Sequence, residues 1–462
     1  YGLFGHKFLT GSEGFSIELV ILMAFSFNVF YLMYHGHLWG DIESAVANKV
    51  RESIPVVLIL FSVGILIGAW IVSGTIPMLI YWGLKIINPT WLYLFSFLIC
   101  ITFSLLTGTS WGSAGTIGIV MMGLGEVFDA DPAINAAAIV GGSFFGDKLS
   151  PLSDTTNVAS LACNVPLMDH VNSMLYTTIP SAIVASIYYF FQSQNLVLSS
   201  DLAVDGSLAN AIGDLEAIFR FNLILLLPLL IVIWGSVRRK PIVMTLLSSA
   251  WVALVLALIF QNFNTSDIFT SLTKGFDDRM ISIPIHSDII KILNRGGLYS
   301  LIEGIVVCLL IFAYLGTLDL LNAIERCISP LMKNLKRTST TVASTLATTF
   351  LTNVTTSNQY ATSFIVAESF KSKYESLKIN RKVLSRSIED AGTMMENLVP
   401  WTPSGIFMAS TLGVATTDYL PYQVLSLTNI IVAFLFAFIG IAIFRTNNVE
   451  ENLNAKNDTD TP

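Results

Sequence analysis

The sequence carries little charge for its length. Only 12% of its 462 residues are charged, 53% are hydrophobic, and the mean hydropathy is +0.68. Soluble globular chains contain roughly 25% charged residues, so this composition excludes a soluble globule and predicts a polytopic membrane protein in a lipid bilayer. The formal net charge of −7 lies mostly in loops and the C-terminal tail. The chain therefore offers no basic surface for nucleic acid.

Cysteine and histidine are scarce as well. Four cysteines lie in or beside apolar stretches without a CxxC spacing: Cys100, Cys163, Cys308 and Cys327. They are predicted to be small core residues rather than disulfide or metal ligands. Five histidines fall in predicted loops or at span ends: His6, His35, His37, His170 and His286. We therefore expect no transition-metal site and no cofactor, and proton chemistry would rest on carboxylates.

Long apolar runs are abundant. A helix needs about 20 mainly apolar residues to cross a bilayer. Full spans are predicted at 15–34, 54–72, 174–194, 219–236, 241–262, 300–318 and 421–444. Polar or Pro residues interrupt four further stretches, which are predicted as hairpins at 90–128 and 338–370 and broken spans at 133–164 and 387–413. Polar backbone at membrane depth must be buried in protein or line a watery cavity.

The two halves of the chain resemble each other in order, at an offset of about 242 to 249 residues. Residues 74–89 resemble 316–330, and 151–171 resemble 400–420. The second half contains an odd number of crossings, which predicts an all-α fold of two inverted repeats with re-entrant hairpins and broken helices. The predicted parts are a first repeat at 1–194, an external linker at 195–218, a second repeat at 219–444 and a cytoplasmic polar tail at 445–462.

The first repeat contains one predicted crossing fewer than the second. The chain also begins with Tyr1 rather than Met. We infer from these two observations that one N-terminal span is missing.

Basic residues are unevenly distributed among the loops. Placing the basic loop 371–386 in the cytoplasm also places most other Lys and Arg there and leaves the acidic loop 195–216 outside. This arrangement predicts a cytoplasmic C-terminus. Both flanks of 338–370 are basic, which favours a re-entrant hairpin over a crossing there.

Four polar segments lie within the interrupted stretches: 108–116, 146–157, 352–360 and 389–405. By the repeat offset the first pairs with the third and the second with the fourth, and paired interruptions predict a transport site near the membrane midplane. Unwound backbone and polar side chains would supply hard oxygen ligands for an alkali cation. The candidates in the hairpins are Thr109, Ser110, Asn353, Thr355 and Thr356. For 108–116, close helix packing of small residues is the alternative interpretation.

The broken span 133–164 contains two carboxylates and a lysine. Inserting an ionisable group near a bilayer centre costs roughly 2.5 to 3.5 kcal/mol, so each of these residues is a candidate functional residue. Asp147 and Asp154 exceed Lys148 by one charge, and the excess can take a proton or a cation. A purely structural ion pair with Lys148 is the alternative. Burial favours the protonated form of a carboxylic acid, whereas a bound cation favours its ionised form. H⁺ and Na⁺ would therefore compete for the same carboxylate.

The second broken span supplies further acids. Glu389 and Asp390 follow Arg386, and Glu396 lies at the position equivalent to Asp147 in the repeat. An interfacial position is the alternative for Glu389. The predicted ion and proton ligands are Asp147, Asp154, Asp390, Glu396, Glu389, Ser150, Ser153, Thr155 and Asn157, with Lys148 compensating charge.

Five segments resemble the signature stretches of the NhaC-type Na⁺/H⁺ antiporters of the ion transporter superfamily. They are GTSWGSAGTIG (108–118), FFGDKLSPLSDTTN (144–157), LYTTIP (175–180), NRGGLYS (294–300) and LSRSIEDAGTMMENLVPWTPSGIFMASTLGV (384–414). The resemblance implies a secondary transporter of a bacterial inner membrane whose substrates are Na⁺ and H⁺. It leaves a homodimer open. Glu396 and Asn397 depart from the family pattern, in which small residues or proline are expected.

Other functions fit the sequence less well. A similar branch of the family exchanges malate for lactate with Na⁺ and H⁺, but the one candidate cation for an organic anion, Lys148, is outnumbered by acids. Gly146 and Asp147 resemble the GD motif of intramembrane aspartyl proteases, yet no intramembrane Tyr-Asp dipeptide supplies the second acid. A passive channel needs a continuous polar lining rather than paired breaks. We therefore expect a transporter and not an enzyme.

Overall fold

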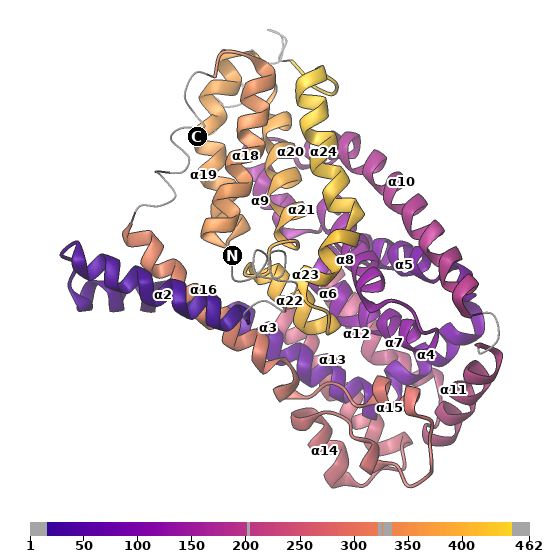
Figure 1. Ribbon diagram of the computed structural model, residues 1–462. Helices are drawn as coiled ribbons and strands as arrows, with labels where there is room; N and C mark the ends of the chain where they lie inside the picture. The colour runs from indigo at the N-terminus through magenta and orange to yellow at the C-terminus, as the bar shows by residue number, and fades with distance from the viewer. Residues whose placement is uncertain (1–15, 201–203, 322–325, 327–334, 446–462) are drawn as a thin grey trace, which may run out of the picture. The chain divides into compact units, whose positions relative to one another are not determined.

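A computed structural model describes residues 16–200, 204–321, 326 and 335–445, and these are almost entirely helical (Figure 1). Within these ranges the only β-structure is an isolated bridge between Ile379 and Arg445. The predicted all-α polytopic class is confirmed. The predicted tail from 446 onward, His6 and Cys327 lie outside the described residues, whereas Cys100, Cys163 and Cys308 are buried free thiols as expected.

Within the part of the chain that the structure describes, six helices are long and apolar enough to cross a membrane. They are α2 (Ile17–Tyr34), α3 (Trp39–Val72), η1 with α5 (Pro89–Thr107), α10 (Leu167–Ser200), α13 (Ile242–Phe260) and η5 with α16 (Leu298–Leu320). Five of them correspond to predicted full spans, although α3 and α10 extend well beyond the predicted ends. The sixth contains α5, which opens the first predicted hairpin.

Two predicted spans have a different form. The helix in the predicted span 219–236 covers Leu223–Val237, and it is bent by 100° from Leu208–Ile218, which falls in the predicted linker. Asn222 starts the new helix because its side chain accepts a hydrogen bond from the Ile224 amide at 3.0 Å. The last predicted span is shorter than expected, since α24 covers only Val424–Ile439.

All four predicted interruptions are helix breaks in the structure. The first lies among α5 (Leu92–Thr107), α6 (Ser110–Ser113), the π-helical segment η2 (Ala114–Gly118) and α7 (Ile119–Val127), and the second lies between α8 (Pro132–Leu149) and α9 (Asp154–Ala162). The third lies between α18 (Thr338–Thr356) and α19 (Gln359–Ser376). The fourth lies among α20 (Arg381–Ala391), α21 (Thr393–Glu396) and α22 (Pro403–Leu412). The inverted orientation of the repeats and their boundaries stay predictions.

The chain forms two compact units. The first contains Tyr1–Gly146, Ser186–Ala323 and Asn397–Gln423, and the second contains Asp147–Ala185, Ile324–Glu396 and Val424–Pro462. Besides the helices already named, the first unit contains α4 (Thr75–Ile86), α11 (Val204–Ile218), η3 (Leu223–Leu226), α12 (Leu227–Val237), α14 (Thr265–Lys274), η4 (Asp278–Met280), α15 (Ser287–Leu293), α23 (Thr416–Tyr419) and η6 (Leu420–Tyr422).

In the first unit α3 packs against α13, α14 and α16. Two of its glycines allow backbone to approach backbone. The Gly297 amide donates a hydrogen bond to the Gly64 carbonyl at 2.7 Å. A Cβ on Gly68 would lie 2.2 Å from the Ser271 carbonyl oxygen. Both contacts require glycine in α3, and Gly297 itself has a positive φ of 88°.

In the second unit α18 and α19 form a helical hairpin that packs on α20, and α24 lies along α18 (Figure 1). Every residue of α20 from Val383 to Ala391 is buried. Its apolar side is covered by a core cluster that includes Val366, Phe370 and Ile388. The acids of α20 are consequently held in the interior of this unit. The hairpin predicted at 338–370 is confirmed, while its re-entrant placement in a bilayer stays a prediction.

Candidate ion-binding site

The break between α8 and α9 is held by side chains. Pro151 has no amide hydrogen with which to continue α8, and Ser153 caps α9 by accepting from the Thr156 amide at 3.5 Å. The Thr156 hydroxyl donates to the carbonyl oxygens of Lys148 at 2.9 Å and Asp147 at 3.2 Å. These carbonyls end α8, where no further turn could bond them. The polar sequence predicted to break the span therefore also stabilises the break.

A second break occurs at Gly392, between α20 and α21. Its backbone leaves the helical region, with φ −92° and ψ −86°. A Cβ at this position would lie 2.3 Å from Oε1 of Gln359, the first residue of α19. The Gly392 carbonyl accepts a hydrogen bond from Nδ2 of Asn353, in the last turn of α18, at 3.2 Å. Three elements of the second unit thus meet at one glycine, and a larger residue would displace Gln359.

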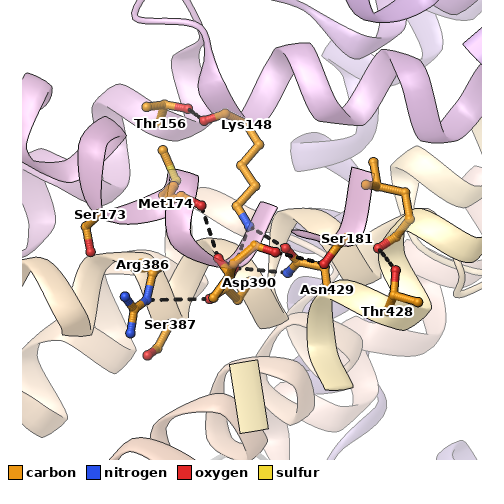
Figure 2. Close-up of polar contacts among 12 residues, drawn as sticks. Lys148, Thr156, Ser173, Met174, Ser181, Arg386, Ser387, Asp390, Thr428 and Asn429 are labelled. Atoms are coloured by element: carbon orange, nitrogen blue, oxygen red, sulfur yellow. Dashed lines mark hydrogen bonds and ion pairs between the residues drawn. The ribbon is translucent and has the colours of Figure 1, made fainter. Parts of the chain in front are cut away.

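A buried ion pair joins α8 to α20. Lys148 Nζ donates to Oδ1 of Asp390 and, at 3.1 Å, to Oδ1 of Asn429 on α24 (Figure 2). The same Asp390 oxygen accepts from Asn429 at 2.9 Å and from the Thr177 hydroxyl at 2.8 Å. Arg386 Nε lies 3.9 Å from Oδ2 of Asp390. Asp390 is therefore held by two cations and two neutral donors.

The partner of Lys148 differs from the one that the sequence suggested. Asp147 and Asp154 were the acids that Lys148 was expected to compensate, whereas its buried partner Asp390 is 242 residues away. Neighbouring residues on a helix do not face each other, so Lys148 can point to α20 while Asp147 points elsewhere. In this pair the charge of Lys148 balances that of Asp390.

Glu389, next to Asp390, is in a different environment. It is fully buried, and neither carboxylate oxygen has a hydrogen-bond partner within the described ranges. The same is true of the Thr393 hydroxyl, both amide atoms of Gln359 and Oδ1 of Asn353. Buried polar atoms without a partner are rare in folded proteins, so a group of them requires an explanation.

The other predicted acids lie in the same unit. Asp147 is 8% exposed and accepts a hydrogen bond from the Ser153 hydroxyl at 2.6 Å. Glu396 ends α21 and is 7% exposed, whereas Asp154 opens α9 and is exposed. Asp147, Asp154, Glu389 and Glu396 all interact electrostatically with the Tyr360 side chain on α19. Acids of both predicted broken spans therefore lie within electrostatic range of one side chain of the second unit.

The neutral residues predicted at the first break contact their own loop. Ser150 is buried, and its hydroxyl accepts from the Leu152 amide at 3.3 Å. Thr155 places its hydroxyl 3.1 Å from that of Ser153. Asn157 donates to the Ser153 carbonyl at 2.6 Å. These contacts shape the loop that presents Asp147.

The hairpin candidates divide between the two units. In the second unit the Thr355 hydroxyl donates to the Leu351 carbonyl at 2.7 Å, and Thr356 Oγ1 lies 3.1 Å from that of Thr362. Asn353 is the member of the predicted set whose side-chain oxygen has no hydrogen-bond partner.

Thr109 and Ser110 belong to the first unit. Thr109 caps α6 by accepting from the Gly112 amide at 3.3 Å, and Ser110 is buried at the start of that helix. In the same unit Trp111 stacks on Phe407, with ring centroids 4.5 Å apart.

Sequence patterns did not distinguish several residues that contact Asp390 or lie beside Gly392: Thr177, Gln359, Arg386, Thr393 and Asn429. Asn429 could have been noticed as an isolated amide in the apolar run of α24. Gln359 lay within a polar segment but no pattern distinguished it. His170, predicted at a span end, lies near the start of α10, fully buried and with neither ring nitrogen hydrogen-bonded.

A helical membrane protein whose paired broken helices carry buried carboxylates has the architecture of a secondary transporter. Residues 142–441 match the sequence model of the "Na+/H+ antiporter family". An uncharacterized Na⁺/H⁺ antiporter of Haemophilus influenzae is 39% identical over 92% of this chain and 91% of its own length. The chain belongs to the Na⁺/H⁺ antiporter family, a family of transporters.

Two further relatives have more specific names. The Na⁺/H⁺ antiporter NhaC of Alkalihalophilus pseudofirmus is 35% identical over 88% of this chain and 86% of its own. A protein named malate-2H⁺/Na⁺-lactate antiporter, from Bacillus subtilis, is 32% identical over 94% of this chain and 91% of its own. The resemblance inferred from the five sequence motifs is confirmed.

Proposed function

We propose that this chain exchanges Na⁺ for H⁺ by alternating access, with the carboxylates at the two helix breaks of its second unit as a shared site for cation and proton. The charge balance of the buried side chains supports this proposal. The acids below 10% exposure at the breaks are Asp147, Glu389, Asp390 and Glu396, and the buried cations beside them are Lys148 and Arg386. Among the described residues these acids outnumber these cations by two, and buried negative charge in a bilayer is costly unless a proton or cation balances it.

Competition for these acids gives antiport its coupling. A site that binds either protons or Na⁺, but not both, carries Na⁺ in one direction and H⁺ in the other when its access alternates between the two sides of the membrane. Under the predicted inverted-repeat topology, the α8–α9 and α20–α21 breaks are equivalent and lie near the midplane of a bacterial inner membrane. Asp154, at the mouth of the first break, would belong to the same site.

A malate/lactate exchanger is the second candidate, favoured by the relative with that name in Bacillus subtilis. Such a substrate requires a cation for its carboxylates. The two buried cations at the breaks already contact Asp390. This arrangement favours an inorganic cation, and malate and lactate serve as comparison substrates in the test.

The first test is Asp147→Asn in everted vesicles containing a pH-sensitive dye. In wild-type vesicles, Na⁺ should discharge the pH gradient, while malate or lactate should not. Asp147→Asn should abolish the Na⁺ response, because asparagine can still accept the Ser153 hydrogen bond but cannot exchange a proton. Asp154→Asn should reduce exchange as well.

The matched control is Asp277→Asn, in a loop of the first unit. Hydrogen bonds from Arg279 lower the pKa of Asp277 to about 2, so the variant also removes one negative charge at every assay pH. Exchange should persist. Wild-type exchange in correctly inserted Asp147→Asn would contradict the site, and a wild-type response to malate or lactate instead of Na⁺ alone would favour the second candidate.

A second prediction concerns sidedness. Single cysteines at Lys378 and Ala209, both exposed in the structure, are introduced after the native cysteines are replaced. Lys378→Cys should react with an impermeant thiol reagent only in everted vesicles, because its loop is predicted to be cytoplasmic. Ala209→Cys should react only in intact cells. Labelling of both from the same side would overturn the predicted topology.

A further inference from the structure

Four buried polar side chains contact Gly392 or flank it in the chain. They are Asn353 at the end of α18, Gln359 at the start of α19, Glu389 on α20 and Thr393 at the start of α21. None is more than 5% exposed. Asn353 Nδ2 bonds the Gly392 carbonyl at 3.2 Å, and the amide of Gln359 fills the space in which a Cβ of Gly392 would lie.

Glu389 and Thr393 complete the group because they lie on either side of the break at Gly392, Glu389 in the last turn of α20 and Thr393 at the start of α21. Thr393 lies close enough to influence the Glu389 carboxylate, although neither makes a hydrogen bond of normal geometry. The hydrogen bonds of the nearby Lys148 go to Asp390 and Asn429. The four side chains therefore present oxygens that no other described protein group uses.

We propose that these four side chains form the coordination shell of a dehydrated monovalent cation. Glu389 supplies the negative charge, and Asn353 Oδ1, Gln359 Oε1 and Thr393 Oγ1 supply neutral oxygens. The proposal rests on the proposed exchange of Na⁺ for H⁺ and deepens it, since it names the residues that hold Na⁺ and places the competing proton on Glu389. Neither amide atom of Gln359 has a partner, so the amide can turn its oxygen toward the ion at no loss of a protein hydrogen bond.

The donor set selects the class of ion. All four ligands are hard oxygens, which suit alkali or alkaline-earth cations and not transition metals. Calcium sites use several carboxylates among 6–8 oxygens, as a general pattern. Here one carboxylate balances one positive charge, and across the described ranges no three His, Cys, Asp or Glu side chains are arranged to hold a metal ion.

Buried water is the competing explanation, because ordered water commonly satisfies polar atoms that have no protein partner. Water and Na⁺ differ in two measurable ways. Only the cation should displace a proton from Glu389, and only cation binding should depend on the neutral oxygens.

The test measures Na⁺ binding to the purified full chain by calorimetry. Gln359→Met keeps the volume but removes the amide oxygen, and Thr393→Val removes the hydroxyl. Each should weaken Na⁺ affinity by about 10- to 100-fold, the usual effect of altering a metal site. Thr341→Val is the matched control, because this buried hydroxyl donates to the Arg337 carbonyl in its own helix. Its Na⁺ affinity should equal that of the wild type.

Gln359→Glu tests the same position without loss of polarity. It adds a second carboxylate to the shell, so more protons should be released per Na⁺ bound, counted from binding heats in buffers of different ionisation enthalpy. A role of Gln359 in packing alone would not change that count. Unchanged affinity in Gln359→Met and Thr393→Val, together with an unchanged proton count in Gln359→Glu, would overturn the shell and leave water as its occupant.

Failure of this shell can be distinguished from failure of the proposed exchange. If wild-type vesicles exchange Na⁺ for H⁺ but Gln359→Met retains normal Na⁺ affinity, the shell is wrong and the function stands. If wild-type vesicles show no exchange but purified protein binds Na⁺ in a Gln359-dependent manner, the shell stands and the function is wrong.

Discussion

Lys148→Met should destabilise the folded protein by about 3–5 kcal/mol, the usual cost of breaking a buried ion pair. The variant removes the ammonium group that contacts Asp390 and Asn429, and Asp390 is only 1% exposed. Solvent cannot replace the missing cation at such a position. The expected result is a large fall in melting temperature and in the yield of monodisperse protein, measured by thermal denaturation in detergent.

A double variant separates the loss of the pair from the loss of side-chain volume. In Lys148→Met/Asp390→Asn, the amide removes the negative charge but still accepts from Thr177, so part of the stability should return. Lys85→Met, which removes the cation of the exposed pair with Glu216, should leave the melting temperature unchanged. A melting temperature for Lys148→Met equal to that of the wild type would show that this pair contributes nothing to the folded state.

Once the pH is below the apparent pKa of the site, each further decrease of one pH unit should lower the apparent Na⁺ affinity. The decrease per pH unit should be about tenfold for every proton that one Na⁺ displaces. The sign follows from competition, since a protonated carboxylate does not bind Na⁺ and must lose its proton first. Above the apparent pKa the affinity should become constant. Because several acids share the site, that pKa belongs to the coupled group rather than to one residue.

Calorimetry between about pH 6 and 9, the range expected for buried carboxylates, measures this dependence directly. Glu389→Gln should weaken Na⁺ binding and flatten its pH dependence, whereas Asp277→Asn should alter neither. Na⁺ binding without proton release at any pH in this range would refute the shared site and would favour the organic-anion exchanger.

The helix breaks could be predicted from sequence because their causes are local. Pro151, Ser153 and Thr156 interrupt α8 and cap α9 within a few residues. Gly392, which comes shortly after Glu389 and Asp390, likewise ends α20. Glycine, proline and capping hydroxyls act on the backbone within a turn or two, so their effects do not depend on the rest of the fold.

The lengths and bends of the spans were less predictable. The apolar composition of residues 219–236 predicted a helix there, but it did not predict the 100° bend between this helix and the preceding one. Apolar composition shows only that a segment prefers lipid or core. Where a helix ends depends on caps such as Asn222 and on the surfaces that it packs against.

The sequence by itself determined that this chain is a helical membrane protein with interrupted spans and that it resembles Na⁺/H⁺ antiporters, and it made Asp and Glu rather than His or Cys the candidate ion and proton ligands. Composition and local motifs carry that information because bilayer insertion and helix capping act on short stretches. Only the tertiary structure decided that Lys148 contacts Asp390 and that Gln359 lies against Gly392. These pairs join separate helices, and a contact between helices depends on packing and helix rotation rather than on spacing along the chain.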